Sequence, residues 1–174
     1  MGKVYGRVQT GSAHFGAVDR RPMITQNLKE QIKIDEGVKY EIYKDHLGYP
    51  TFGVGHLILR TDAEYHQAEG AVVSKERVDE CLVNDLQTSF DECLVLYPWF
   101  RDSPQEVQEI LINMMFNLGR PRLSKFKNFA RAMEEQNWKQ AAIEGRDSQW
   151  YRQVTNRAER LMTRMEALST GTLY

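Results

Sequence analysis

The chain has 174 residues, of which 41% are hydrophobic and 27% are charged, and its formal net charge at pH 7 is -1. This length and composition allow one domain or two small lobes with a buried core, and they exclude a disordered or fibrous chain. The balanced charge gives no indication of bulk nucleic-acid binding, and no segment approaches the ~20 apolar residues that cross a bilayer. We therefore expect a globular protein with no nucleic-acid partner and no stable insertion in a membrane.

Residues 1–24 differ in composition from the rest of the chain. They are rich in Gly and mixed polar residues, show no sustained hydrophobic period, and are predicted to form an arm or linker. They also lack the apolar run of a secretory signal. We therefore expect the protein to be made and kept in a cytoplasm unless another factor releases it.

A short helix is predicted in "TQNLKEQIKIDEG". Asn27 and Glu30 have the spacing of a capping pair, and Gly37 can adopt the left-handed conformation that ends a helix. This helix would carry Glu36 at its C-terminal end.

A β-hairpin is predicted next. "VKYEIYKD" alternates as a half-buried strand does, "HLGYP" supplies a turn, and "TFGVGHLI" is interpreted as one return strand. On that strand Phe52 would face the core, while Thr51, Gly53 and Gly55 would form a nearly bare opposite face. Such glycines indicate either a bulge or a ligand lying close to the backbone, and a merely twisted hairpin would also explain them.

A long amphipathic helix is predicted over residues 74–96, with Ser74 as its cap. Cys81 and Cys93 fall within it, and a rise of about 1.5 Å per residue places them roughly 18 Å apart, beyond the reach of a disulfide. We expect two free thiols that pack as small apolar residues.

The chain after Pro98 is predicted to be helical throughout, including a helix capped by Ser103, with Pro104 in its first turn, and ended by Gly119. The predicted fold class is therefore α+β. A small mixed lobe over residues 25–73 is joined by the long helix, residues 74–96, to an all-helical lobe over residues 97–174. A cleft between two lobes is a preferred place for a polymeric substrate.

Two acids lie at the two ends of the first strand of the predicted hairpin, Glu36 before it and Asp45 at its far end. Hydrolysis of a glycosidic bond needs one protonated carboxylic acid and one ionised carboxylate. The negative end of the helix macrodipole favours the protonated form of Glu36, while Asp45 beside a turn would stay ionised and act as base. Thr51 could hold the attacking water. The spacing alone also fits solvated surface charges.

The motifs "IDEG", "IYKD", "GYPTFGVGHLI", "INMMFNLG" and "GRDSQWYRQVTNRAERL" occur in this order. From about Leu28 to Gly171 the chain resembles the T-even bacteriophage lysozymes of glycoside hydrolase family twenty-four. The resemblance implies a lysozyme-like fold and a muramidase that cleaves the β-1,4 bond between N-acetylmuramic acid and N-acetylglucosamine in peptidoglycan. It also implies inversion at the anomeric carbon, with no cofactor and no metal.

The resemblance assigns catalytic roles to three positions. Glu36 matches the general acid, Asp45 the second carboxylate, and Thr51 the threonine beside the catalytic water.

Three further positions match residues that support the site. His56 matches a mainly structural histidine, and Asp35 is the expected acid partner of His56. Arg157 matches an arginine that reaches from the helical lobe toward the catalytic glutamate.

The resemblance also implies four substrate-binding positions: Gly55, Leu57, Asn117 and Phe126. Trp150 is expected in the core rather than as a sugar platform.

Two features depart from the family pattern. The small lobe is shorter after His56, which predicts a reduced cleft rim. The segment "RPRLSKFK" adds cations near the expected cleft mouth, namely Arg120, Arg122, Lys125 and Lys127. These cations either attract an anionic wall polymer or are simply solvated.

Several alternatives remain open. The chain is similar also to the lysozyme domain of the T-even tail spike, so a virion component is an alternative to a free lytic enzyme. A free enzyme, made in the bacterial host cytoplasm and acting on the periplasmic wall as a monomer, would depend on a phage membrane pore, a holin. A non-hydrolytic wall-binding relative would have lost an acid, and a lytic transglycosylase would not need Asp45 and Thr51. A helical nucleic-acid binder would need a clustered basic face.

Overall fold

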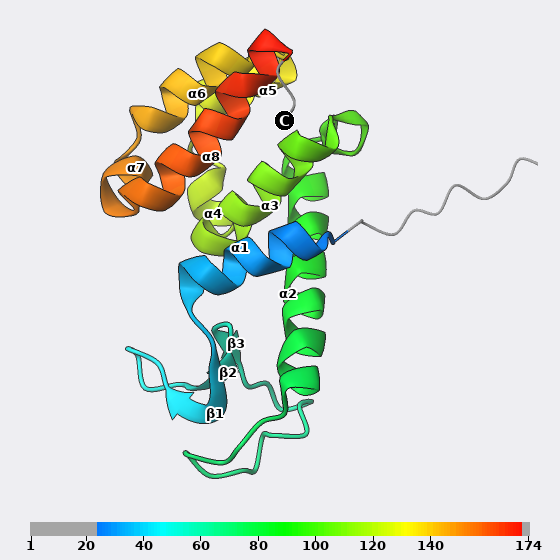
Figure 1. Ribbon diagram of the computed structural model, residues 1–174, viewed down its shortest axis with the longest axis vertical. Coiled ribbons are helices and arrows are strands. Elements are labelled where there is room, and N and C mark those ends of the chain that lie inside the picture. Colours follow the sequence, from blue (N-terminus) through cyan, green and yellow to red (C-terminus); the bar gives the residue numbers. More distant parts are fainter. Residues whose placement is uncertain (1–23, 172–174) are drawn as a thin grey trace, which may run out of the picture.

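The order of the helices and strands gives an α+β fold, which confirms the predicted class. The computed structural model describes residues 24–171, so nearly all of the arm predicted over residues 1–24 lies outside the described residues. A three-stranded antiparallel sheet with the order β1-β2-β3 lies at one end of the molecule, and most helices gather at the other (Figure 1).

The elements follow one another as α1 (Gln26–Glu36), β1 (Lys39–Lys44), β2 (Pro50–Gly53), β3 (His56–Leu57), α2 (Lys75–Leu96), α3 (Gln105–Leu118), α4 (Arg120–Leu123), α5 (Lys127–Glu134), α6 (Trp138–Arg146), α7 (Gln149–Gln153) and α8 (Thr155–Ala167). Two short 3-10 helices, Phe100–Asp102 and Leu168–Thr170, complete the described chain.

Helix α1 begins one residue after Thr25 and ends at Gly37. The Thr25 hydroxyl accepts a hydrogen bond from the Leu28 backbone N–H at 3.1 Å and donates one to Glu109 at 2.6 Å. The prediction that Asn27 caps this helix is therefore wrong, because Thr25 takes that position through a contact with a distant helix. Gly37 has a φ of 75° and ends α1, as predicted.

The predicted single return strand is two short strands joined by a tight turn. Phe52 pairs with His56, and the glycines on either side of the turn, Gly53 and Gly55, have φ values of 63° and 73°. Their role is therefore to form the turn and not to provide a bare face. Gly53 also lies against helix α2, since a Cβ built on it would be 3.1 Å from a methyl carbon of Val78.

Helix α2 runs from the sheet to the helical part of the molecule (Figure 1). The hydroxyl of Ser74 accepts a hydrogen bond from the Arg77 N–H at 3.1 Å, which confirms the predicted cap. Cys81 and Cys93 lie buried along this helix as free thiols, as expected.

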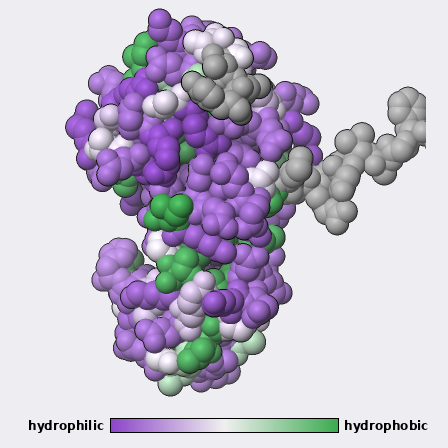
Figure 2. All heavy atoms as spheres, viewed as in Figure 1, coloured by the Kyte–Doolittle hydropathy of each residue, from purple (hydrophilic) through white to green (hydrophobic). Residues whose placement is uncertain are grey.

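Helix α3 lies at the centre of the helical part and is buried along most of its length. It begins at Gln105, and the hydroxyl of Ser103 donates to the Phe100 carbonyl at 2.6 Å, so the predicted capping by Ser103 is wrong. None of the helices in residues 24–171 is long and apolar enough to cross a membrane. Figure 2 shows a mostly hydrophilic face with some hydrophobic residues at the waist between the sheet and the helices.

Candidate active site

Glu36 occupies the last position of α1, where the chain leaves the helix for the sheet. One of its carboxylate oxygens, Oε1, lies 2.5 Å from Nη1 of Arg157 on α8. The Glu36 side chain is 30% exposed, whereas the Arg157 side chain is 7% exposed. A buried cation therefore fixes an acid that solvent can reach.

Arg157 is itself held by Asn113, a fully buried residue of α3. Nε of Arg157 donates to the Asn113 side-chain oxygen at 2.8 Å, and Nη2 donates to the Asn113 backbone carbonyl at 3.3 Å. These bonds use the planar geometry of the guanidinium group, which a lysine does not have. Helices α1, α3 and α8 thus meet at one arginine.

Asp35 supports the same arginine. Its Oδ2 lies 3.4 Å from Nε of Arg157, and its Oδ1 accepts a hydrogen bond from Arg160. The expectation that Asp35 pairs with His56 is therefore wrong. Asp35 at the end of α1 faces α8, whereas His56 on β3 faces α2.

A cavity of about 560 Å³ opens beside Glu36. Its wall contains four residues singled out in the sequence, Asp35, Glu36, Asn117 and Arg157. The ends of α1, α3, α7 and the start of α8 supply this wall, so the cavity lies on the helical side of the acid.

Asp45 and Thr51 lie in the hairpin and are not part of that wall. The Asp45 carboxylate oxygen Oδ1 accepts hydrogen bonds from the backbone N–H groups of Leu47 at 2.8 Å and Tyr49 at 2.9 Å. The Thr51 side chain is buried, and its hydroxyl donates to the Tyr49 carbonyl at 3.0 Å. The β1–β2 turn therefore fixes the orientation of both groups.

The phenol of Tyr43 is affected by the charges of both predicted acids. Burial raises the pKa of its phenol, and the charges of Asp45 and Glu36 raise it further. Tyr43 is also the partner of Thr51 across β1 and β2. Both predicted carboxylates therefore lie close enough to Tyr43 to raise its pKa, and Thr51 is its partner on the neighbouring strand.

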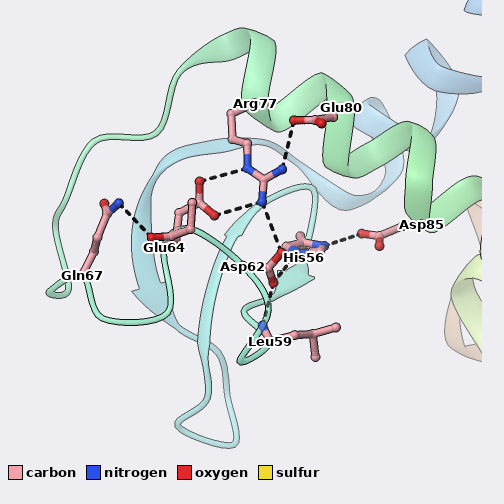
Figure 3. Close-up of polar contacts among 9 residues, drawn as sticks. His56, Leu59, Asp62, Glu64, Gln67, Arg77, Glu80 and Asp85 are labelled. Carbon is pink, nitrogen blue, oxygen red and sulfur yellow. Dashed lines mark hydrogen bonds and ion pairs between the residues drawn. The ribbon is translucent and has the colours of Figure 1, made fainter.

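His56 belongs to a separate network that ties the sheet to α2 (Figure 3). Its Nδ1 lies 2.9 Å from Asp85 on α2, and its Nε2 lies 3.2 Å from Asp62. Arg77 bonds the other oxygen of Asp62 at 3.2 Å and also binds Glu64 at 2.9 Å. The hydrogen bond to Asp85 raises the pKa of His56, against burial, which lowers it.

The remaining predicted substrate positions are dispersed. Gly55 and Leu57 are exposed at the β2–β3 turn and on β3, outside the cavity beside Glu36. Phe126 lines a second cavity together with Trp150. Trp150 is buried, and its indole N–H donates to the Asn117 side chain at 2.8 Å, which agrees with its expected place in the core.

Sequence reasoning missed Tyr43, Asn113, Arg160 and also Gln153, which lines the cavity beside Glu36. Asn113 carried a usable signal, since a polar residue inside the apolar stretch "ILINMMF" of a predicted helix indicates a buried hydrogen bond. The other three positions carried no signal that distinguishes them from surface residues. Within the described residues, no group of three or more His, Cys, Asp or Glu side chains is placed to hold a metal ion.

Comparison with known proteins gives a consistent result. The family described as phage lysozyme matches residues 33–167. Probable T4-type lysozyme 2 of Dictyostelium discoideum is 30% identical over 169 residues, which cover 86% of this chain and 98% of that protein. The pre-baseplate central spike protein Gp5 of Enterobacteria phage T4 is 29% identical, with 78% of this chain and 27% of that protein covered. Peptidoglycan hydrolase gp36 of Pseudomonas phage phiKMV is 27% identical, with 80% and 15% covered. The chain therefore belongs to the phage lysozyme family, and its activity is hydrolysis of the lysozyme type.

Proposed function

We propose that this protein is a muramidase that hydrolyses the β-1,4 bond between N-acetylmuramic acid and N-acetylglucosamine in bacterial peptidoglycan. The observation that carries the proposal is the placement of Glu36 at a cavity of about 560 Å³, fixed through Oε1 by buried Arg157. Its second oxygen, Oε2, makes no hydrogen bond to the described residues, so it is free to face a glycosidic oxygen.

In this proposal Glu36 is the general acid and Asp45 is the base that activates water. The turn N–H groups hold Oδ1 of Asp45, and Oδ2 has no partner among residues 24–171 and can accept a proton from water. The Thr51 hydroxyl donates to Tyr49 and keeps lone pairs that can accept from the same water. Attack from the face opposite the leaving group would invert the anomeric carbon.

Product analysis on purified peptidoglycan tests the proposal. Wild type should release hydrated reducing muramic acid ends, Glu36→Gln should abolish cleavage with the fold preserved, and Asp45→Asn should reduce it severely. Glu30→Gln on the exposed face of α1 is the matched control and should cleave normally. NMR of the first-formed anomer reports inversion or retention.

Other products would refute specific parts of the proposal. Anhydro ends would make the protein a lytic transglycosylase, and binding without cleavage by wild type would make it a wall-binding module. Near-normal activity of Glu36→Gln or Asp45→Asn would remove that residue from its assigned role.

The biological setting proposed is lysis of the host by a monomeric enzyme that reaches the wall through a phage holin. Expression inside cells should then lyse them only when a membrane pore is also made. The match to the Gp5 spike protein favours a second candidate, a virion-associated lysozyme used during entry. Immunoblotting of purified virions separates the two, because only a virion component would copurify with the particles.

A further inference from the structure

A second cavity adjoins the one beside Glu36. Its volume is about 450 Å³, and its wall includes Arg122, Lys125, Phe126, Trp150 and Gln153. Gln153 also lines the cavity beside Glu36, so the two spaces meet at this side chain. The hydrogen bond from Trp150 to Asn117, which lines the first cavity, joins the two walls a second time. A substrate bound at Glu36 can therefore continue past Gln153 into the second cavity.

The second cavity carries uncompensated positive charge. Arg122 and Lys125 line it, neither forms an ion pair within residues 24–171, and its wall contains no acidic side chain. Other cations nearby are neutralised: Arg120 lies 2.5 Å from Glu92, and Arg157 is paired with Glu36. Of the cations predicted near the cleft mouth, Arg122 and Lys125 are thus placed to meet a ligand, whereas Arg120 is occupied elsewhere.

We infer that Arg122 and Lys125 make the enzyme selective for peptidoglycan whose stem peptides carry free carboxylates over peptidoglycan in which those carboxylates are amidated. The inference rests on the proposed function. N-Acetylmuramic acid bears its peptide on the lactyl group, so a strand cleaved at Glu36 presents a peptide beside the scissile bond. A carboxylate gains charge-assisted hydrogen bonds from arginine and lysine, whereas a neutral amide gains weaker ones and adds a donor that faces cations.

The rest of the cavity wall suits a short peptide. The Gln153 side-chain amide offers one donor group and one acceptor to a peptide backbone. Phe126 supplies an apolar surface, which the buried Trp150 supports from behind with its ring centroid 6.3 Å away. The two cations then distinguish peptides by charge, because the remaining groups bind charged and neutral peptides alike.

The test compares two soluble, uncrosslinked peptidoglycan preparations that differ only in amidation of the glutamate α-carboxylate. For each enzyme the measured quantity is the ratio of kcat/KM on the free-acid substrate to kcat/KM on the amidated one. Wild type should prefer the free acid by about 10-fold at low ionic strength, in line with charge-assisted hydrogen bonds. The preference should fall as salt is added, because exposed charges are screened.

The double variant Arg122→Gln/Lys125→Gln should lower the ratio to near one. Arg120→Gln, which removes a neighbouring cation already paired with Glu92, should keep the wild-type ratio. Circular dichroism confirms that each variant is folded. A wild-type ratio near one, or an unchanged ratio in the double variant, would overturn the inference.

A third substrate separates this inference from the proposed function. Glycan strands stripped of peptides by an amidase carry no group that the second cavity would recognise. Cleavage of these strands by wild type without discrimination between the two peptide substrates would refute the selectivity and leave the muramidase assignment intact. Failure to cleave any of the three substrates would refute both.

Discussion

Arg157 joins three helices at Glu36, the proposed general acid, and its removal should affect both stability and activity. In Arg157→Ala the buried Asp35 and Asn113 lose partners, and Glu36 loses the cation that orients it. We expect the free energy of unfolding to fall by about 3–5 kcal/mol, the cost of breaking a buried ion pair, with loss of activity. Urea denaturation and a wall-lysis assay measure the two effects.

The substitution Arg157→Lys separates the effect of the positive charge from that of the guanidinium geometry. Arg157→Lys retains the charge but not the planar fork that reaches Asn113 and Glu36 together. It should therefore recover part of the stability and little of the activity. Arg152→Ala on the exposed part of α7 is the control and should behave as wild type. Full activity in Arg157→Lys would show that a positive charge at this position is sufficient to orient Glu36, without the planar guanidinium group.

His56 should make stability depend on pH in a definite direction. Its hydrogen bond to Asp85 raises its pKa above the ordinary value of 6.5, so the folded state holds the proton more tightly than the unfolded chain. This contribution is fully present below pH ~6.5 and is lost as the pH rises through the raised pKa. Burial raises the pKa of Asp62, but bonds from Leu59 and His56 lower it overall, so Asp62 stays charged in this range.

The comparison is between wild type and His56→Gln. The variant should lose most stability near pH 5.5, and the difference in free energy of unfolding should shrink toward pH 9. Exposed His46→Gln serves as the control and should show no such trend. A stability difference that grows with pH would contradict the protonated pairing of His56 with Asp85 and Asp62.

The β2–β3 turn depends on two glycines for different reasons. Gly53 and Gly55 both have positive φ, but only a Cβ at Gly53 would approach Val78, at 3.1 Å. Gly53→Ala should therefore cost about 1–3 kcal/mol of unfolding free energy, and Gly55→Ala should cost less because it adds strain without crowding. Midpoints of urea denaturation measure both. Equal losses of unfolding free energy in the two variants would show that packing of the turn on α2 contributes nothing to stability.

The elements themselves were largely predictable, and the errors have physical causes. The amphipathic period identified α2, and Gly37 and Gly119 marked the ends of α1 and α3. The return strand was misjudged because alternation of Gly with larger residues resembles a strand pattern, while the positive φ of those glycines is invisible in the sequence. Thr25 and Asn27 are both of residue types that cap helices, and the bond from Thr25 to Glu109, which is distant in the chain, cannot be seen in the sequence.

At the scale of the whole molecule, the site could be predicted only in part. Family motifs pointed to Glu36, Asn117 and Arg157, which line one cavity. Whether His56 pairs with Asp35 or with Asp62 and Asp85 depends on how elements distant in the chain pack together. Sequence spacing could therefore not predict its partners. The role of Asp45 and Thr51 as partners of Glu36 stays a prediction, because neither residue lines the cavity beside Glu36.

Helix α2 spans the molecule, and its two thiols offer a test of how the sheet and the helical part unfold. Burial raises the pKa of Cys81 to about 11 and raises that of Cys93 further, so neither forms much thiolate at neutral pH. Cys81 lies on the turn of α2 that faces the sheet through Val78, and Cys93 lies near the opposite end of the helix. In the native protein at pH 7.5, both should react with a thiol reagent only through unfolding.

Buried residues line α2 along its length, from Val78 to Cys93, so the sheet and the helices should unfold together. Single-thiol variants, Cys81→Ala and Cys93→Ala, allow each position to be labelled across a urea series. The two labelling curves should coincide with each other and with the loss of helical circular dichroism, because opening either thiol requires global unfolding. Labelling of Cys81 at lower urea than Cys93 would instead show that the sheet, with Asp45 and Thr51, opens while Glu36 and Arg157 remain folded. Glu36 and Asp45, the proposed acid and base, would then belong to separate folding units.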